Sequence, residues 1–166
     1  FNYSVNWQLF RTFVFHIIIF SFLITIFFYD LMHKEIPDRF SLPAIAIAIA
    51  IGLILRMPAP LAMLLGGGGL LVFFLLQFLI SKGTWIGGGD IRLGALIGVL
   101  LGWEKGLLAV IIAYLLGAVI SIYLLANKKV TGKSTIPFGP FLVIGTIVAI
   151  FYGQKILDWY LNTLLF

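Results

Sequence analysis

Two aspartates next to apolar runs are the residues of this chain best suited to catalysis. Asp30 directly follows a long apolar run, and Asp90 directly follows Gly87, Gly88 and Gly89. An ionisable group at the edge of such a run is costly and is a functional candidate by default, although either aspartate alone could serve as a helix boundary, with Asp90 as an N-cap. The three glycines allow backbone, and an extended substrate, to approach the second carboxylate closely.

As a pair, the aspartates could carry out peptide hydrolysis. Two neighbouring carboxylates that are partly removed from water cannot both ionise easily, so the pair holds one proton. The ionised member can act as a general base on water, and the protonated member can polarise a carbonyl and protonate the leaving amine. This chemistry needs neither metal nor cofactor. No metal site is expected, because the chain has no Cys and its two His, His16 and His33, are isolated in the sequence.

The composition requires lipid as the solvent. Hydrophobic residues make up 62% of the 166 residues and charged residues 10%, whereas a soluble domain carries about a quarter charged residues. A chain of this length cannot bury so much apolar surface in one aqueous core. A spanning helix needs about 20 apolar residues, which allows roughly six spans. We therefore predict a single all-α domain over 1–166, a polytopic bundle of about six transmembrane helices.

The apolar runs predict where these spans lie. The expected spans are 9–29, 40–55, 61–80, 93–101, 106–126 and 136–152, with 156–166 as an extension of the last. The glycines at 66–69 weaken their helix but should permit close contact with a neighbouring helix.

The loop charges predict the orientation of the bundle. Six spans alternate sides, so the loops after the first, third and fifth spans share one side. Seven basic residues belong to that side and four to the other; they are Lys34, Arg39, Lys82, Arg92, Lys128, Lys129 and Lys133 against Arg11, Arg56, Lys105 and Lys155. The positive-inside rule places the first group in the cytoplasm. Both aspartates then lie at the cytoplasmic face of the inner membrane. The net charge of +5 is thus explained by basic loop residues that meet the anionic headgroups of membrane lipid. No nucleic-acid partner is expected.

A third segment should lie at the same face. Pro137, Phe138, Gly139 and Pro140 open the last span, and two prolines around a glycine make a rigid helix start. This placement suggests a wall of the active site, although Phe138 could equally belong to a lipid-facing aromatic belt.

Three stretches together resemble the type IV prepilin peptidases, a family of intramembrane aspartic proteases. They are Asp30 with Ile36-Pro37-Asp38 six residues later, the Gly-x-Gly-Asp signature at 87–90 that the family shares with presenilins, and the Ile-Pro-Phe-Gly-Pro-Phe stretch at 136–141. The resemblance implies that Asp30 and Asp90 are the catalytic pair. It also implies a pilin or pseudopilin precursor as substrate, in type IV pilus or type II secretion systems, with a basic leader removed at the cytoplasmic face.

The resemblance leaves methylation open. Many members also methylate the new N-terminus with S-adenosylmethionine, and they carry an extra N-terminal region, often with paired zinc-binding cysteines. Neither feature is present in this sequence, so S-adenosylmethionine is expected only if a methyltransferase region exists. Where many relatives have lysine two residues after the second aspartate, this chain has Arg92.

Two other functions remain open at this point. A preflagellin peptidase would use the same chemistry on a different substrate. In a small ion- or proton-coupled transporter the aspartates would bind a cation or relay protons, but such a site is expected near mid-membrane rather than at loop–helix junctions.

Two further acids are candidates for substrate recognition. Glu35 and Asp38 are the only acids on the expected cytoplasmic side besides the pair. We expect them to read the charge of a basic leader, while the hydrophobic helix of the precursor enters laterally from lipid.

Overall fold

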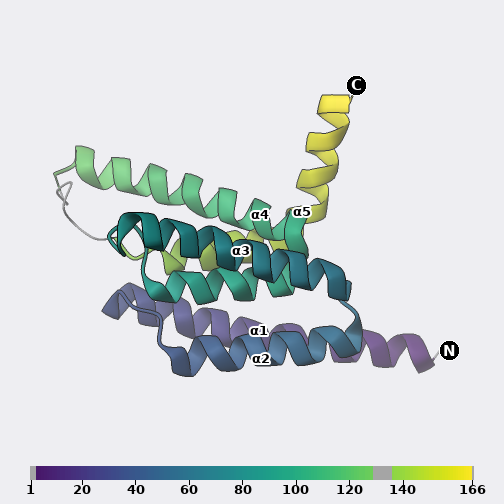
Figure 1. The fold of residues 1–166 in the computed structure, drawn as a ribbon. Coiled ribbons are helices and arrows are strands. Elements are labelled where there is room, and N and C mark those ends of the chain that lie inside the picture. The colour runs from purple at the N-terminus through teal and green to yellow at the C-terminus, as the bar shows by residue number, and fades with distance from the viewer. Residues whose placement is uncertain (1–2, 129–135, 166) are drawn as a thin grey trace.

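The structure is a computed structural model that describes residues 3–128 and 136–165, and the regular secondary structure within them is entirely helical (Figure 1). The helices are α1 (Tyr3–His33), α2 (Asp38–Leu55), α3 (Pro60–Ser81), α4 (Gly88–Ala126) and α5 (Gly139–Leu165). All five are long and apolar enough to cross a membrane, and many of their large apolar side chains are exposed. In lipid a helix satisfies its own backbone hydrogen bonds. The chain is therefore an integral membrane protein with the all-α, polytopic fold that the composition predicts.

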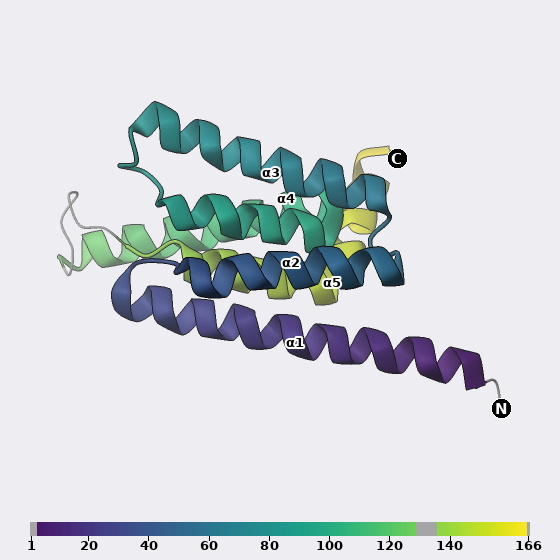
Figure 2. The ribbon, with the colours of Figure 1, turned by 60° about the horizontal axis from the view of Figure 1, so that its bottom comes forward.

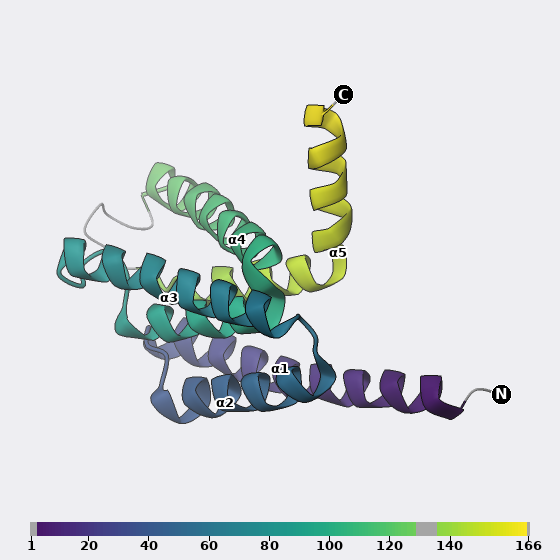
Figure 3. The same cartoon turned by 45° about the vertical axis from the view of Figure 1, so that its right-hand side comes forward.

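α4 contains a reversal at the place where the sequence predicts the boundary between the fourth and fifth spans. Gly102 has φ 73° and ψ −173°, a non-helical conformation inside α4 that a residue with a side chain rarely adopts. In Figures 2 and 3 the segment after Gly102 runs back toward the end at which α4 began. The two parts of α4 thus occupy the places of the fourth and fifth expected spans. The first part begins at Gly88 rather than at Leu93.

α4 is the centre of the packing. It contacts α2, α3 and α5, while α1 packs on α2 and α5. Four of these helices each place a fully buried residue in the core: Leu23, Phe74, Leu93 and Leu142.

The glycine run of α3 allows the close packing that its sequence predicts. A Cβ atom on Gly66 would overlap the backbone of Gly98 in α4, and one on Gly67 would lie 2.7 Å from Val99. A Cβ on Gly68 would meet nothing within 4 Å. The close approach of α3 and α4 therefore depends on particular glycines of the run.

Both aspartates lie at one end of the bundle. α1 ends there, α2 begins there, and the junctions of α3 with α4 and of α5 with the preceding segment are at the same end (Figure 1). The alternation of sides is thus as expected, although Lys129 and Lys133 lie outside the described residues. At the other end α5 continues through the expected extension and turns away from the bundle (Figure 3).

Candidate active site

Asp30 and Asp90 share one cavity. Asp30 lies near the end of α1 and Asp90 in the first turn of α4, and their exposed fractions are only 4% and 7%. Both line a cavity of about 540 Å³ at their end of the bundle. The structure therefore brings together two carboxylates that are separated by two membrane crossings in the chain.

A hydrogen bond at the N-terminus of α4 holds the Asp90 carboxylate. Gly87 is the N-cap of α4, in extended conformation with φ −81° and ψ 158°. Its backbone N–H donates a hydrogen bond of 2.8 Å to Oδ2 of Asp90. This is the arrangement in which an acidic N3 side chain caps a helix. Asp90 is thus the third residue of the helix rather than its N-cap, and the same contact that starts α4 orients the carboxylate.

Asp30 is held by a residue from the other end of the sequence. The backbone N–H of Gly139, at the start of α5, donates a buried hydrogen bond of 2.9 Å to Oδ2 of Asp30. A Cβ atom on Gly139 would lie 2.5 Å from that oxygen. The absence of a side chain at Gly139 therefore permits the contact that fixes Asp30.

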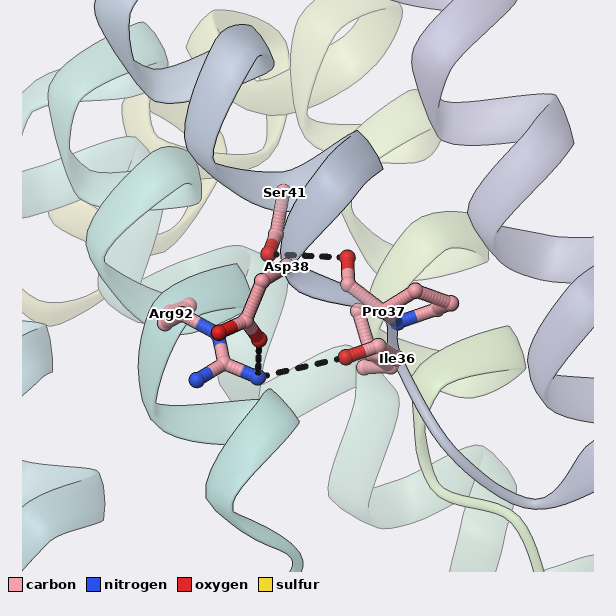
Figure 4. Close-up of polar contacts among 5 residues, drawn as sticks. All are labelled: Ile36, Pro37, Asp38, Ser41 and Arg92. Atoms are coloured by element: carbon pink, nitrogen blue, oxygen red, sulfur yellow. Dashed lines mark hydrogen bonds and ion pairs between the residues drawn. The ribbon is translucent and has the colours of Figure 1, made fainter.

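An arginine joins the loop after α1 to the first turn of α4. Figure 4 shows Nη2 of Arg92 donating to the carbonyl oxygen of Ile36 at 3.2 Å and pairing with the carboxylate of Asp38. Next to it, Oγ of Ser41 donates to the carbonyl oxygen of Pro37 at 3.2 Å. The two contacts of Arg92 hold the segment 36–38 against the first turn of α4, which carries Asp90.

The segment 36–38 also contacts the glycines at the start of α4 directly. A Cβ atom on Gly89 would lie 2.6 Å from Cβ of Ile36, whereas one on Gly88 would meet nothing within 4 Å. Of the three glycines, Gly89 is therefore the one whose missing side chain lets the first turn of α4 meet the segment 36–38.

Comparison with known families assigns the chain. The sequence model of the type IV leader peptidase family matches residues 17–122, a stretch that contains both aspartates. The chain belongs to this family.

Curated relatives agree with the assignment. The chain is 34% identical over 151 residues to a prepilin leader peptidase/N-methyltransferase of Legionella pneumophila, covering 84% of the chain and 50% of the relative. Proteins of the same name from Xanthomonas campestris and Bacillus subtilis are 32% and 30% identical, each over 97% of the chain and over 56% and 63% of the relative. The chain thus spans about half the length of the curated relatives it matches. No solved structure gives a significant match.

In this member of the type IV leader peptidase family, most of the site residues predicted from the sequence line the cavity that Asp30 and Asp90 share. Besides the aspartates, the lining includes Gly87, Gly88, Gly89, Pro137, Phe138, Glu35 and Asp38. Gly139 contacts Asp30 instead, and Pro140 is buried in the first turn of α5. The contact from Gly139 lies beyond the stretch that matches the family model.

One part of the lining is not among the site residues predicted from the sequence. Thr84, Trp85 and Ile86 belong to the cavity wall. Their loop is fixed by Ser81, whose carbonyl oxygen accepts a bond of 2.7 Å from Oγ1 of Thr84, and whose Oγ accepts one of 3.3 Å from the Trp85 N–H. The only signal in the sequence was their position directly before the glycines.

No cluster suited to a metal ion is found in the described residues: nowhere do three His, Cys, Asp or Glu side chains come together. Each of the two carboxylates at this end of the molecule is oriented by a backbone amide.

Proposed function

We propose that this chain is the peptidase part of a prepilin leader peptidase, in which Asp30 and Asp90 hydrolyse one peptide bond of a pilin or pseudopilin precursor. The observation that carries the proposal is the shared cavity, which is lined by two buried carboxylates from helices far apart in the sequence. The family match and the names of the relatives support the reaction and the substrate class.

The hydrogen bonds give the two oxygens of each carboxylate different roles. Backbone amides of Gly139 and Gly87 hold Oδ2 of Asp30 and Asp90, which leaves Oδ1 of each for water and substrate. The ionised aspartate takes a proton from water, and the water oxygen attacks the scissile carbonyl carbon. The protonated aspartate donates its proton to the leaving nitrogen as the C–N bond breaks. Neither a metal nor a cofactor takes part in this reaction.

The site is proposed to face the cytoplasm from the inner membrane. Five of the described basic residues belong to the end of the bundle that carries the aspartates and four to the other end; the five are Lys34, Arg39, Lys82, Arg92 and Lys128. The side with more basic residues is the cytoplasmic one. The hydrophobic helix of the precursor would remain in lipid and approach between helices, because it cannot leave the bilayer cheaply.

The position of the aspartates favours a peptidase over a transporter. Asp30 lies three residues before the end of α1 and Asp90 two residues after the start of α4, whereas transport sites lie near the middle of the membrane. The proposal concerns peptide hydrolysis alone. S-adenosylmethionine would be required only by a methyltransferase region.

Replacement of either aspartate tests the proposal. Purified Asp30→Asn and Asp90→Asn variants should each lose at least about 100-fold in the rate of precursor cleavage, measured by mass spectrometry of the shortened product. Asp158→Asn is the matched control, because Asp158 is exposed and bonds only Gln154 among the described residues. It should cleave normally. Full activity in either active-site variant would remove that aspartate from the catalytic role.

A further inference from the structure

A second cavity lies at the end of the bundle away from the aspartates. Its volume is about 340 Å³. Helices α1, α2, α4 and α5 and the turn after α2 form its walls, with lining residues that include Thr12, Phe15, His16, Ile19, Arg56, Lys105 and Ile150. The proposed peptidase reaction makes no use of this cavity.

The polar part of this cavity is cationic. Arg56 and Lys105 both line it, and no acidic residue does. In the part of the chain that the structure describes, the single ion pair is between Arg92 and Asp38, so neither cation is neutralised there by a carboxylate. A cavity with two cations and no acid is suited to an anion.

The basic residues are positioned by the fold. Arg56 ends α2 in the left-handed conformation, with φ 54°. The stem of Lys105 crosses Gly153 of α5, where a Cβ atom would lie 3.4 Å from its Cγ and Cδ. Nδ1 of His16 lies 2.7 Å from the carbonyl oxygen of Thr12. Because a carbonyl only accepts, Nδ1 carries the hydrogen, and Nε2 is the nitrogen available to the cavity.

The other walls are apolar. Phe15, Ile19, Leu100, Leu101 and Ile150 line the cavity together with the cations. A ligand that satisfies both parts must be amphipathic, with an anionic group beside an apolar one. Free inorganic phosphate would leave the apolar walls without a partner.

The cavity lies in the half of the membrane opposite the aspartates. His16 precedes Asp30 by 14 positions in α1, which corresponds to about 21 Å along the helix axis, and the hydrocarbon core is about 30 Å thick. Trp7, Trp103 and Trp159 belong to the same end of the bundle and are 65%, 44% and 68% exposed. Exposed tryptophans of this kind mark the headgroup level.

We propose that this cavity binds an anionic phospholipid of the leaflet opposite the active site. Arg56 and Lys105 contact the phosphate, and the start of an acyl chain lies on Phe15, Ile19 and Ile150. The rest of the lipid extends along the exposed apolar surface of the bundle. Such a lipid joins α1, the end of α2, α4 and α5 at the end remote from catalysis.

Native mass spectrometry of the full chain tests this site with phosphatidylglycerol and phosphatidylcholine as probes. The wild type should bind one phosphatidylglycerol at least about tenfold more tightly than phosphatidylcholine. The double variant Arg56→Gln/Lys105→Gln should lose about tenfold or more of the affinity for phosphatidylglycerol. Arg11→Gln/Lys155→Gln removes the same charge from exposed positions at the same end, outside the cavity, and should change the affinity by less than about twofold.

Two further measurements separate loss of binding from loss of folding, and a lipid ligand from free phosphate. Arg56→Lys/Lys105→Arg keeps both charges and should retain binding even if the glutamine variant does not fold. Millimolar inorganic phosphate should not displace the lipid. Equal affinities for the two lipids, or equal losses in the cavity variant and the Arg11/Lys155 control, would overturn the proposal. Displacement by inorganic phosphate would overturn the assignment to lipid.

Discussion

The hydrogen bond from the backbone amide of Gly139 is the contact that most directly fixes the Asp30 carboxylate. The hydrogen bond is buried and joins residues 109 positions apart. It requires a close approach of α5 to α1, which any side chain at position 139 would oppose. At the residue scale, the stretch 136–141 thus shapes the site in two ways. The amide of Gly139 binds Asp30, and Pro137 and Phe138 line the cavity.

Gly139→Ala should therefore reduce cleavage. The added methyl group would lie 2.5 Å from Oδ2 of Asp30, and a displacement of about 1 Å in a catalytic group can cost about 100-fold in rate. We expect a loss of this order in kcat, measured with a saturating precursor. Gly68→Ala is the control, since its methyl group meets nothing within 4 Å and Gly68 does not line the cavity. Equal activity of the two variants would show that the amide contact does not position Asp30 for catalysis.

Arg92 has a structural role that its sequence position did not reveal. It bonds the Ile36 carbonyl and pairs with Asp38. The side chains of Arg92 and Asp38 are 31% and 63% exposed, so the ion pair itself contributes about 0–1 kcal/mol. The hydrogen bond to the carbonyl adds about 1 kcal/mol.

Variants of this pair should differ in stability. Arg92→Gln removes both contacts and should lower the free energy of unfolding by about 1–2 kcal/mol. Asp38→Asn removes only the ion pair and should cost about 0–1 kcal/mol. Both values can be measured by titration with sodium dodecyl sulfate in mixed micelles. A larger loss for Asp38→Asn than for Arg92→Gln would contradict the assignment of the carbonyl bond.

At the element scale, the packing of α3 on α4 depends on glycines at particular positions. Gly66 lies against the backbone of Gly98, while Gly68 faces open space within the structure. Where small residues meet, helix backbones can approach closely and gain dispersion contacts in lipid. The reversal of α4 at Gly102 then returns its second part along the bundle.

This arrangement predicts opposite effects from the same substitution two positions apart. Gly66→Ala should lower the free energy of unfolding by about 1–3 kcal/mol or more, because it overpacks a contact between two backbones. Gly68→Ala should leave stability unchanged or raise it by up to about 1 kcal/mol, since alanine is the better helix former. Detergent titration of both variants checks the difference. Similar losses in both would mean that helix flexibility, rather than close packing, explains the glycines.

At the scale of the whole molecule, the cavity with the aspartates is lined by charged side chains of both signs. Glu35 lines it together with Lys34 and Arg92, while Asp38 is already paired with Arg92. Of the two acids that the sequence offered for reading a basic leader, Glu35 is therefore the better placed.

Charge reversal at this position tests leader recognition. Glu35→Lys should raise KM for a precursor with a basic leader by a few-fold, because an exposed ion pair contributes about 0–1 kcal/mol, and the effect should weaken with salt. A neutral-leader substrate should be much less affected. Glu104→Lys, an exposed reversal at the other end of the bundle, is the control. Equal changes for both substrates would place leader recognition elsewhere.

The sequence by itself determined the membrane class, the approximate spans and the side shared by Asp30 and Asp90. These properties follow from the chain locally: a long apolar run in lipid must satisfy its own backbone, and each crossing inverts the side. The tertiary structure alone decided the partners of the carboxylates, the contact of Arg92 with Ile36 and the second cavity. Such contacts depend on how each helix is rotated about its axis and how deep it lies against its neighbours. Hydropathy does not determine either quantity.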